Sequence, residues 1–213
     1  MNVLIVGATR GLGAHLVSRY ASDASTTVYG TTRGSSLPSS PVGKNITWLS
    51  SIDIADPKCG STLASKLGSV NLSVVIITAG YFATETLDSP DWDNEVKMYT
   101  TSAVGPVFIV SGLVKAGALS KGSKVIIVSS ESGSITLRHE KEGGGNYGHH
   151  ASKAASNMVA KLLSLDLKER GVGVLSVHPG FMRTEMTKGV GFDKFWDAGG
   201  GTSRLSACGW KDA

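Results

Sequence analysis

Three glycines near the N-terminus have the spacing of a diphosphate-binding turn. Gly7, Gly11 and Gly13 directly follow a run of apolar residues, Val3–Val6. A tight strand-to-helix turn needs a residue without Cβ, and a pyrophosphate approaches such a turn only where the backbone is bare. The first amides of the following helix, which carry a partial positive charge, then bind the phosphates. The predicted diphosphate-binding segment comprises Gly7, Ala8, Thr9, Arg10, Gly11, Leu12 and Gly13. The alternative is a turn that holds no ligand.

The end of the second predicted strand indicates which dinucleotide is bound. An acid at this place would accept hydrogen bonds from the ribose 2′-hydroxyl and would repel a 2′-phosphate. The strand ends instead in Thr31, Thr32 and Arg33. Arg33 and Arg10 can hold a 2′-phosphate through charge-assisted hydrogen bonds, so the sequence favours NADP(H) over NAD(H). The alternative is that either arginine is an exposed loop charge.

The elements that position these residues are short apolar runs alternating with stretches of helical periodicity. Several runs are continuous Val/Ile segments, which is typical of strands buried on both faces of a parallel sheet. Repeated strand–helix units predict an α/β fold with a single doubly wound, Rossmann-like parallel sheet. The predicted strands are Val3–Val6, Thr27–Thr31, Ile46–Leu49, Val74–Thr78, Val125–Ser129 and Val172–Val177. The predicted helices are Gly13–Ser22, Pro57–Leu67, Asp91–Val114 and His149–Arg170, the last ended by Gly171 in a left-handed conformation.

Composition restricts the class of protein. The chain has 213 residues, 41% of them hydrophobic and 18% charged, as expected for one globular domain with a sizeable core. The formal net charge is +4 and the basic residues are scattered, which argues against nucleic acid as a partner. Cys59 and Cys208 lack metal-ligand spacing, and the first apolar run is too short for a signal peptide or a membrane span. We therefore expect a cytoplasmic protein with a small-molecule substrate and no membrane partner.

The spacing GxxxGxG resembles the fingerprint of the short-chain dehydrogenase/reductase family, and further motifs similar to that family follow in the right order. The resemblance covers residues 1 to about 190 and is closest to the small C-factor-like members around Tyr147–Met158 and Val177–Met186. It implies that Asp53 and Ile54 meet the adenine, and that Lys153 holds the ribose. It also implies cofactor contacts for the end of an NNAG-like turn and for a PGxxxT element. These residues are Thr78, Ala79 and Gly80, and then Pro179, Gly180 and Thr184.

The same resemblance implies a catalytic Tyr four residues before Lys153, a Ser that holds the reacting oxygen, and an Asn that anchors a water molecule. The serine is Ser130, which begins an SxxG element. His149 stands where the family has Tyr, and Ser102 stands where it has Asn. With an ordinary pKa of about 6.5, a histidine transfers protons near neutrality, and a neighbouring ammonium group favours its neutral, basic form. The alternative for His149 is a packing or surface residue.

Tyr147 and the other histidines are weaker candidates. Tyr147 lies six residues before Lys153, so on a regular helix it points away from the lysine. We expect His150 to point elsewhere than His149, His139 to lie in a loop over the substrate pocket, and His178 to serve packing. The histidines have no HxxxH spacing, so no metal site is expected.

The C-terminal segment departs from the family pattern. We expect the domain to cover residues 1–198, with a short helix over Lys188–Asp197 that presents Phe192, Phe195 and Trp196, followed by a flexible tail over residues 199–213. The last strand of the family's sheet is expected to be missing, which exposes the sheet edge. By analogy with the family, the helices Asp91–Val114 and His149–Arg170 are expected to form a homodimer or a higher homo-oligomer.

Three functions are consistent with these residues. The first is an NADP(H)-dependent oxidoreductase acting on a small carbonyl or alcohol, with His149 exchanging the proton. The second is a non-redox enzyme on the same fold, such as an isomerase, cyclase, dehydratase or epimerase, in which His149 is the general base. The third is a nucleotide-binding or signalling protein without catalysis, because one fold hosts many activities.

Overall fold

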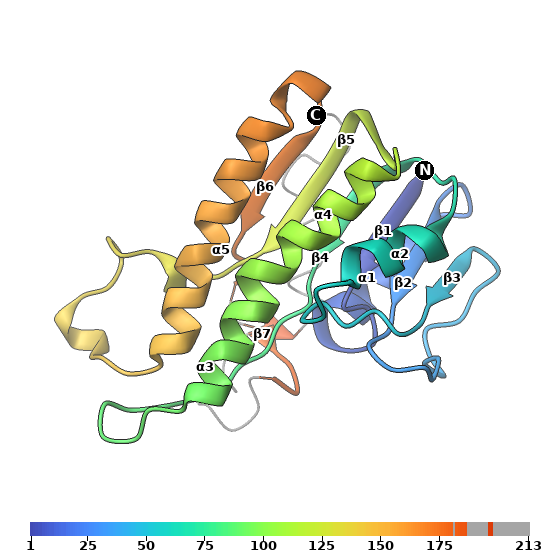
Figure 1. Ribbon diagram of the computed structural model, residues 1–213. Helices are drawn as coiled ribbons and strands as arrows, with labels where there is room; N and C mark the ends of the chain where they lie inside the picture. Colours follow the sequence, from blue (N-terminus) through green and yellow to red (C-terminus); the bar gives the residue numbers. More distant parts are fainter. Residues whose placement is uncertain (181, 187–195, 198–213) are drawn as a thin grey trace.

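A computed structural model describes residues 1–180, 182–186 and 196–197, except the side chains of Glu142, Arg183, Trp196 and Asp197. Six parallel strands form one sheet in the order β3-β2-β1-β4-β5-β6 (Figure 1). The order reverses direction beside β1, as in a doubly wound sheet, so the fold expected from the sequence is confirmed. The strands are β1 (Asn2–Val6), β2 (Thr27–Thr31), β3 (Ile46–Leu49), β4 (Leu72–Ile77), β5 (Leu119–Val128) and β6 (Gly173–Val177).

Helices cover both faces of this sheet. The helices are α1 (Gly11–Ala21), α2 (Cys59–Leu67), α3 (Trp92–Tyr99), α4 (Gly105–Lys115) and α5 (Tyr147–Asp166). Side chains of α2, α4 and α5 share one core cluster with one set of strand residues. Side chains of α1 share a second cluster with the alternate strand residues, such as Val3 and Ile5. Burial on both faces explains why the strands are continuous apolar runs.

The helix predicted over Asp91–Val114 is interrupted in its middle. A π-helical turn over Thr100–Val104 separates α3 from α4. Gly105 follows this turn and packs so tightly that a Cβ there would lie 2.3 Å from the carbonyl oxygen of Ile54. The π-helical turn therefore lies next to the point where the helix approaches the loop after β3. Turns of this kind are frequent at functional sites.

Helix α5 begins at Tyr147, two residues before the predicted start. After Asp166 the chain makes a 3-10 turn over Lys168–Arg170, and Gly171 follows in the left-handed conformation with φ 66°. The left-handed conformation predicted for Gly171 is therefore confirmed, but Gly171 ends the 3-10 turn, whereas α5 itself ends at Asp166 with Leu167 as its C-cap residue. The early start adds a first turn that carries Gly148, His149 and His150.

Strand β6 is the last strand of the sheet in the described part of the chain. Two further short strands, β7 (Met182–Arg183) and β8 (Trp196–Asp197), pair in parallel with each other. The prediction of a helix over Lys188–Asp197 is therefore wrong at its last two residues, which pair with β7. Its other residues, Phe192 and Phe195 included, and the predicted tail over residues 199–213 lie outside the described residues. In the described segments no helix is both long and apolar enough to cross a membrane.

Candidate active site

The glycine turn after β1 is shaped by contacts that exclude side chains. Gly7 has φ +88°, and a Cβ there would lie 2.6 Å from the backbone nitrogen of Ala79. A Cβ on Gly13 would lie 2.1 Å from the Gly7 carbonyl oxygen, so the first turn of α1 packs directly on the glycine turn. The Thr31 hydroxyl at the end of β2 accepts a hydrogen bond of 3.0 Å from the Gly7 amide. The turn is a rigid, bare backbone surface at a helix N-terminus, which fits a diphosphate.

Two other predicted cofactor segments lie beside this turn. The Thr78 hydroxyl at the end of β4 donates to the carbonyl oxygens of Val6 and Gly7, each at 3.0 Å. The side chain of Thr184 faces Gly11, because a Cβ on Gly11 would lie 3.6 Å from its methyl carbon. In the same way, a Cβ on Gly80 would lie 3.6 Å from the methyl carbon of Met186. Parallel strands bring these segments together at the carboxyl ends of the strands.

The residues expected at the adenosine end lie at the end of β2 and after β3. Arg10, the N-cap residue of α1, and Arg33 are both exposed. The Thr32 hydroxyl donates to the carbonyl oxygen of Gly34 at 2.6 Å, which fixes the loop that carries Arg33. Asp53 is exposed and accepts the Ala55 amide at 3.0 Å, while Ile54 is buried. No acidic residue stands at the end of β2, as the sequence states.

Ser130, His149 and Lys153 come from two elements that pack against each other. Ser130 begins a 3-10 turn over Glu131–Gly133, and its hydroxyl accepts the Ser132 amide at 3.1 Å. A Cβ on Gly133 would lie 2.6 Å from the carbonyl carbon of Lys153, so this turn lies directly on α5. His149 and Lys153 are one helical turn apart and share a face of α5. The Lys153 amine donates to the Val128 carbonyl at the end of β5 at 3.0 Å.

The environment of this face lowers the pKa of both groups. Burial, followed by the charges of Lys153 and His150, lowers the pKa of His149 to about 4. Burial also lowers the pKa of Lys153 to about 8. Nδ1 of His149 is buried without a hydrogen-bond partner, and its ring meets the Phe82 ring edge-on with centroids 4.8 Å apart. At neutral pH the imidazole is therefore uncharged.

Ser102 lies inside the π-helical turn between α3 and α4. It is buried, and its hydroxyl has no hydrogen-bond partner. A buried polar group without a partner is costly, which makes a water molecule or a ligand group at this place expected. The water-anchoring role that the family resemblance implies for Ser102 stays a prediction.

Comparisons with known proteins are consistent with this geometry. The family model described as short chain dehydrogenase matches residues 1–194. The chain belongs to the short-chain dehydrogenase/reductase family. Among its relatives is 1-hydroxy-2-glutathionyl-2-methyl-3-butene dehydrogenase of Rhodococcus sp. strain AD45, 32% identical over 87% of this chain and 80% of the relative.

Solved structures show the same fold. An NADPH-bound carbonyl reductase from chicken fatty liver superimposes with a TM-score of 0.81 at 22% identity, over 95% of this chain and 84% of that chain. A short-chain dehydrogenase/reductase from Burkholderia multivorans with bound NADP gives a TM-score of 0.83 at 24% identity, over 97% of this chain and 89% of that chain. The chain therefore has the same Rossmann-like fold as these proteins.

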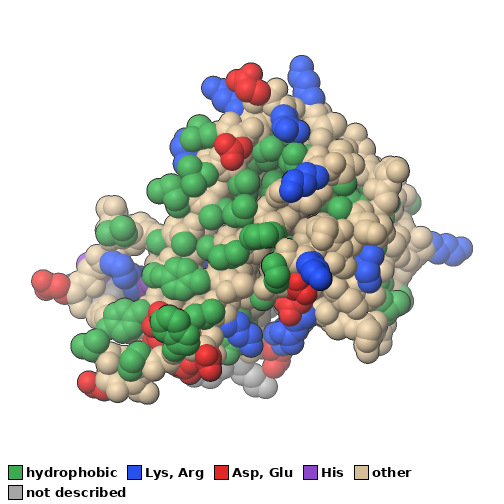
Figure 2. Space-filling view, in the orientation of Figure 1, with side chains coloured by type: hydrophobic (Ala, Val, Ile, Leu, Met, Phe, Trp, Pro, Cys, Tyr) green, Lys and Arg blue, Asp and Glu red, His purple; other side chains and the backbone are tan. Residues whose placement is uncertain are grey.

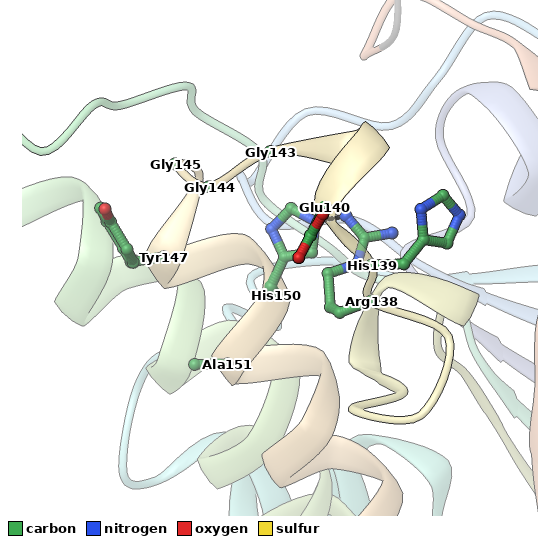
Figure 3. Close-up of a pocket in the computed structure, with 9 residues that line it drawn as sticks. All are labelled: Arg138, His139, Glu140, Gly143, Gly144, Gly145, Tyr147, His150 and Ala151. Atoms are coloured by element: carbon green, nitrogen blue, oxygen red, sulfur yellow. Dashed lines mark hydrogen bonds between the residues drawn. The ribbon is translucent and has the colours of Figure 1, made fainter.

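In this short-chain dehydrogenase, Tyr147 and His150 belong to a separate cavity of about 570 Å³. The cavity lies between the loop over residues 138–145 and the first turn of α5, where Tyr147 projects from the opposite side of the turn from His150 (Figure 3). Nδ1 of His150 bonds the Asn146 carbonyl oxygen at 2.8 Å, and Arg138 donates to Nε2 at 3.0 Å. His150 thus bonds Asn146 and Arg138, but its ring still lies edge-on to the His149 ring with centroids 5.6 Å apart, so the expectation that it points elsewhere holds only for its hydrogen bonds. His139 lines the same cavity. No group of three or more His, Cys, Asp or Glu in the described residues has metal-binding geometry.

Two residues near the site were missed by the sequence reasoning. Phe82, in the loop between β4 and α3, contacts His149, and only its position shortly after Ala79 and Gly80 hinted at it. Glu85, in the same loop, is buried and bonds the backbone amide that precedes His149. His178, expected to serve packing, instead lies 3.6 Å from the Glu131 carboxylate, next to Ser130.

Proposed function

We propose that this chain is an NADP(H)-dependent oxidoreductase acting on a small carbonyl or alcohol, with His149 in the place of the family's Tyr. The observation that carries the proposal is the shared face of α5 on which His149 and Lys153 lie one turn apart beside Ser130. The printed names of relatives, a dehydrogenase and an NADPH-bound carbonyl reductase, support the reaction class.

The bare turn formed by Gly7 and Gly13 would hold the diphosphate, since each Cβ there would collide with backbone. The bound dinucleotide supplies the hydride donor or acceptor. Ser130 would hold the substrate oxygen, and Lys153, released from the Val128 carbonyl, would bond the ribose hydroxyls. Ser102, with its unpartnered hydroxyl, would anchor a water molecule that connects the site to solvent.

The low pKa of His149 favours one direction of the redox reaction. At neutral pH the imidazole is unprotonated, so it accepts a proton more readily than it donates one. The site therefore favours oxidation of an alcohol, in which Ser130 orients the hydroxyl and His149 receives its proton.

The test is hydride transfer itself. Primary and secondary alcohols deuterated at the carbinol carbon are incubated with NADP⁺, and the deuterium content of the NADPH formed is measured by mass spectrometry. We expect labelled NADPH from the wild type and at least about a hundredfold slower labelling by His149→Ala, which removes the proton acceptor. Absence of label with every alcohol and aldehyde tried, in either direction, would contradict the proposal.

Preference for NADP(H) rests on the missing acid at the end of β2 and on exposed Arg10 and Arg33. We expect Arg33→Ala to weaken NADPH binding about tenfold, which is about 1.4 kcal/mol, and to leave NADH binding unchanged. Titration calorimetry with both cofactors measures this difference. Arg19→Ala, on the last turn of α1 and away from the glycine turn, is the matched control. Equal losses for NADPH and NADH would refute the preference.

A second candidate is favoured by the same neutral imidazole. A general base opposite Ser130 could abstract a proton from a substrate without net redox change, as in an isomerase or an epimerase. Exchange of substrate hydrogen with D₂O that needs His149 and leaves NADPH unconsumed would establish it. A protein that binds nucleotide without catalysis would show neither exchange nor hydride transfer, and His149→Ala would then have no effect.

Homodimerisation is proposed through the face formed by α4 and α5. Figure 2 shows hydrophobic side chains gathered over this face. The exposed apolar residues there are Val104 in the π-helical turn, Val107 and Phe108 on α4, and Met158, Leu162 and Leu165 on α5. An exposed apolar face on two adjacent helices is typical of an interface between copies. Light scattering should give a dimer for the wild type and a monomer for Phe108→Glu. The cytoplasm remains the predicted compartment.

A further inference from the structure

Glu85 joins the first turn of α5 to the loop that carries Phe82. One carboxylate oxygen accepts the Gly148 amide at 2.7 Å, and the other accepts the Asp91 amide at 3.1 Å. Asp91 is the N-cap residue of α3, and Gly148 is the second residue of α5. A single buried carboxylate thus bonds amides at the N-termini of two helices, where a negative charge is favourable.

The backbone of Glu85 is tied to the same turn. Its carbonyl oxygen accepts the Asn146 amide at 3.0 Å, and its amide donates to the Asn146 side-chain oxygen at 3.2 Å. Asn146 is the N-cap residue of α5 and has φ +51°, yet its side chain makes no cap bond to its own helix. The Glu85 carboxylate, which accepts the Gly148 amide, takes the place of the missing cap bond. The first turn of α5 therefore depends on a residue 63 positions earlier in the chain.

The turn also packs closely against α3. A Cβ on Gly148 would lie 2.6 Å from the Met98 methyl carbon and 2.9 Å from Cγ of Glu95. The Glu85 carboxylate accepts a further hydrogen bond from the Glu95 side chain. The Gly148 bond lowers the pKa of Glu85, while burial and the Glu85 charge raise the pKa of Glu95, so Glu95 takes up a proton more readily than Glu85.

We propose that Glu85 is a positioning residue for His149, acting through the Gly148 amide that it holds. His149 directly follows Gly148, and its ring packs on Phe82 of the loop that Glu85 belongs to. The carboxylate therefore fixes both partners of the His149–Phe82 contact. It keeps the imidazole buried on the face that it shares with Lys153. The inference rests on the proposed catalytic place of His149, but the position of the ring can be measured without any turnover.

The experiment titrates His149 by NMR in protein with ¹³C-labelled histidine, assigning its signal by its loss in His149→Asn. Gln in Glu85→Gln can accept only one of the two amides, so the turn loosens and the ring gains water. We expect the pKa of His149 to rise by at least about one unit towards its ordinary 6.5. Asn146→Gly, which keeps the left-handed backbone but loses the bond to the Glu85 amide, should raise it in the same direction.

Glu95→Gln is the matched control, because its amide still donates to Glu85 and both helix caps remain. It should leave the pKa of His149 within about 0.3 of the wild-type value. In the alcohol oxidation assay with NADP⁺, Glu85→Gln should also lower kcat about tenfold and change KM for NADP⁺ less than twofold. An unchanged His149 titration in both Glu85→Gln and Asn146→Gly overturns the inference. A wild type without hydride transfer would overturn the proposed function alone and leave the titration result standing.

Discussion

Acid should destabilise the folded chain through His149, and His149→Asn should remove that effect. The pKa of His149 is about 4 in the folded chain, against 6.5 for an ordinary histidine. Above pH 6.5 the ring is neutral in both the folded and the unfolded state, so it contributes no pH dependence. Between pH 6.5 and 4 the unfolded chain binds a proton that the folded chain does not bind. The free energy of unfolding therefore falls as the pH is lowered through this window.

The size of the effect follows from the difference in pKa. One pKa unit corresponds to about 1.4 kcal/mol, so the complete effect is about 3.4 kcal/mol. At pH 4.5 most of it has developed. Because the ring is only partly buried, we reduce the value and expect about 2 kcal/mol of lost stability from His149 alone.

The assay is urea unfolding at pH 7.5 and pH 4.5 for the wild type and His149→Asn. All other groups titrate in both proteins, so they cancel in the comparison. The loss of stability between the two pH values should be about 2 kcal/mol smaller for His149→Asn. His15→Asn, which removes an exposed histidine from α1, controls for the loss of one ring. Equal pH dependence in His149→Asn and the wild type would show that the ring is not held neutral by burial.

Three further substitutions test the packing and the cofactor turn. Gly60→Ala would place a Cβ 1.9 Å from the Phe108 carbonyl oxygen, so the free energy of unfolding measured with urea should fall by at least about 2 kcal/mol. Gly34→Ala is the control, because a Cβ there meets no atom, and it should change the free energy of unfolding by less than about 0.5 kcal/mol. Gly13→Ala would displace the Gly7 carbonyl and should weaken NADPH binding at least about tenfold by calorimetry; undiminished affinity would place the diphosphate elsewhere. Because the folded-state pKa of Lys153 is about 8, against 10.5 for an ordinary lysine, Lys153 should add about 2 kcal/mol of stability between pH 7.5 and 9.5. Urea unfolding at the two pH values should therefore show a change that is more favourable by about this amount in the wild type than in Lys153→Met.

The sheet was predictable from the sequence because strands that are buried on both faces appear as continuous runs of apolar residues. Each predicted strand lies on an observed one, and the differences are at the ends, as at β5, which starts at Leu119 instead of Val125. The π-helical turn was not predictable. It lies next to the close approach of Gly105 to the Ile54 carbonyl oxygen, which joins parts of the chain that no local pattern connects.

Some residues of the candidate site were also predictable from the sequence, and others were not. Gly7, Gly13 and Lys153 lie in motifs whose spacing reflects a local requirement, so the sequence identifies them. Phe82 and Glu85 act on a helix turn that lies more than sixty residues later, and nothing in the loop between β4 and α3 marks them. Contacts of this kind depend on how α3 and α5 pack, which only the three-dimensional structure provides.

The proposed role of His149 in the place of the family's Tyr also changes the effect of Lys153 on the proton acceptor. A tyrosine needs a nearby positive charge to lower its pKa into the working range, because the charge stabilises the phenolate. A histidine gains its charge on protonation, so the same ammonium group stabilises the neutral ring, and Lys153 is the second cause of the low pKa of His149. The pair is therefore electrostatically consistent only if His149 works as a neutral base. An acid role at this position would require the lysine charge to move away or to be neutralised, whereas proton acceptance requires neither.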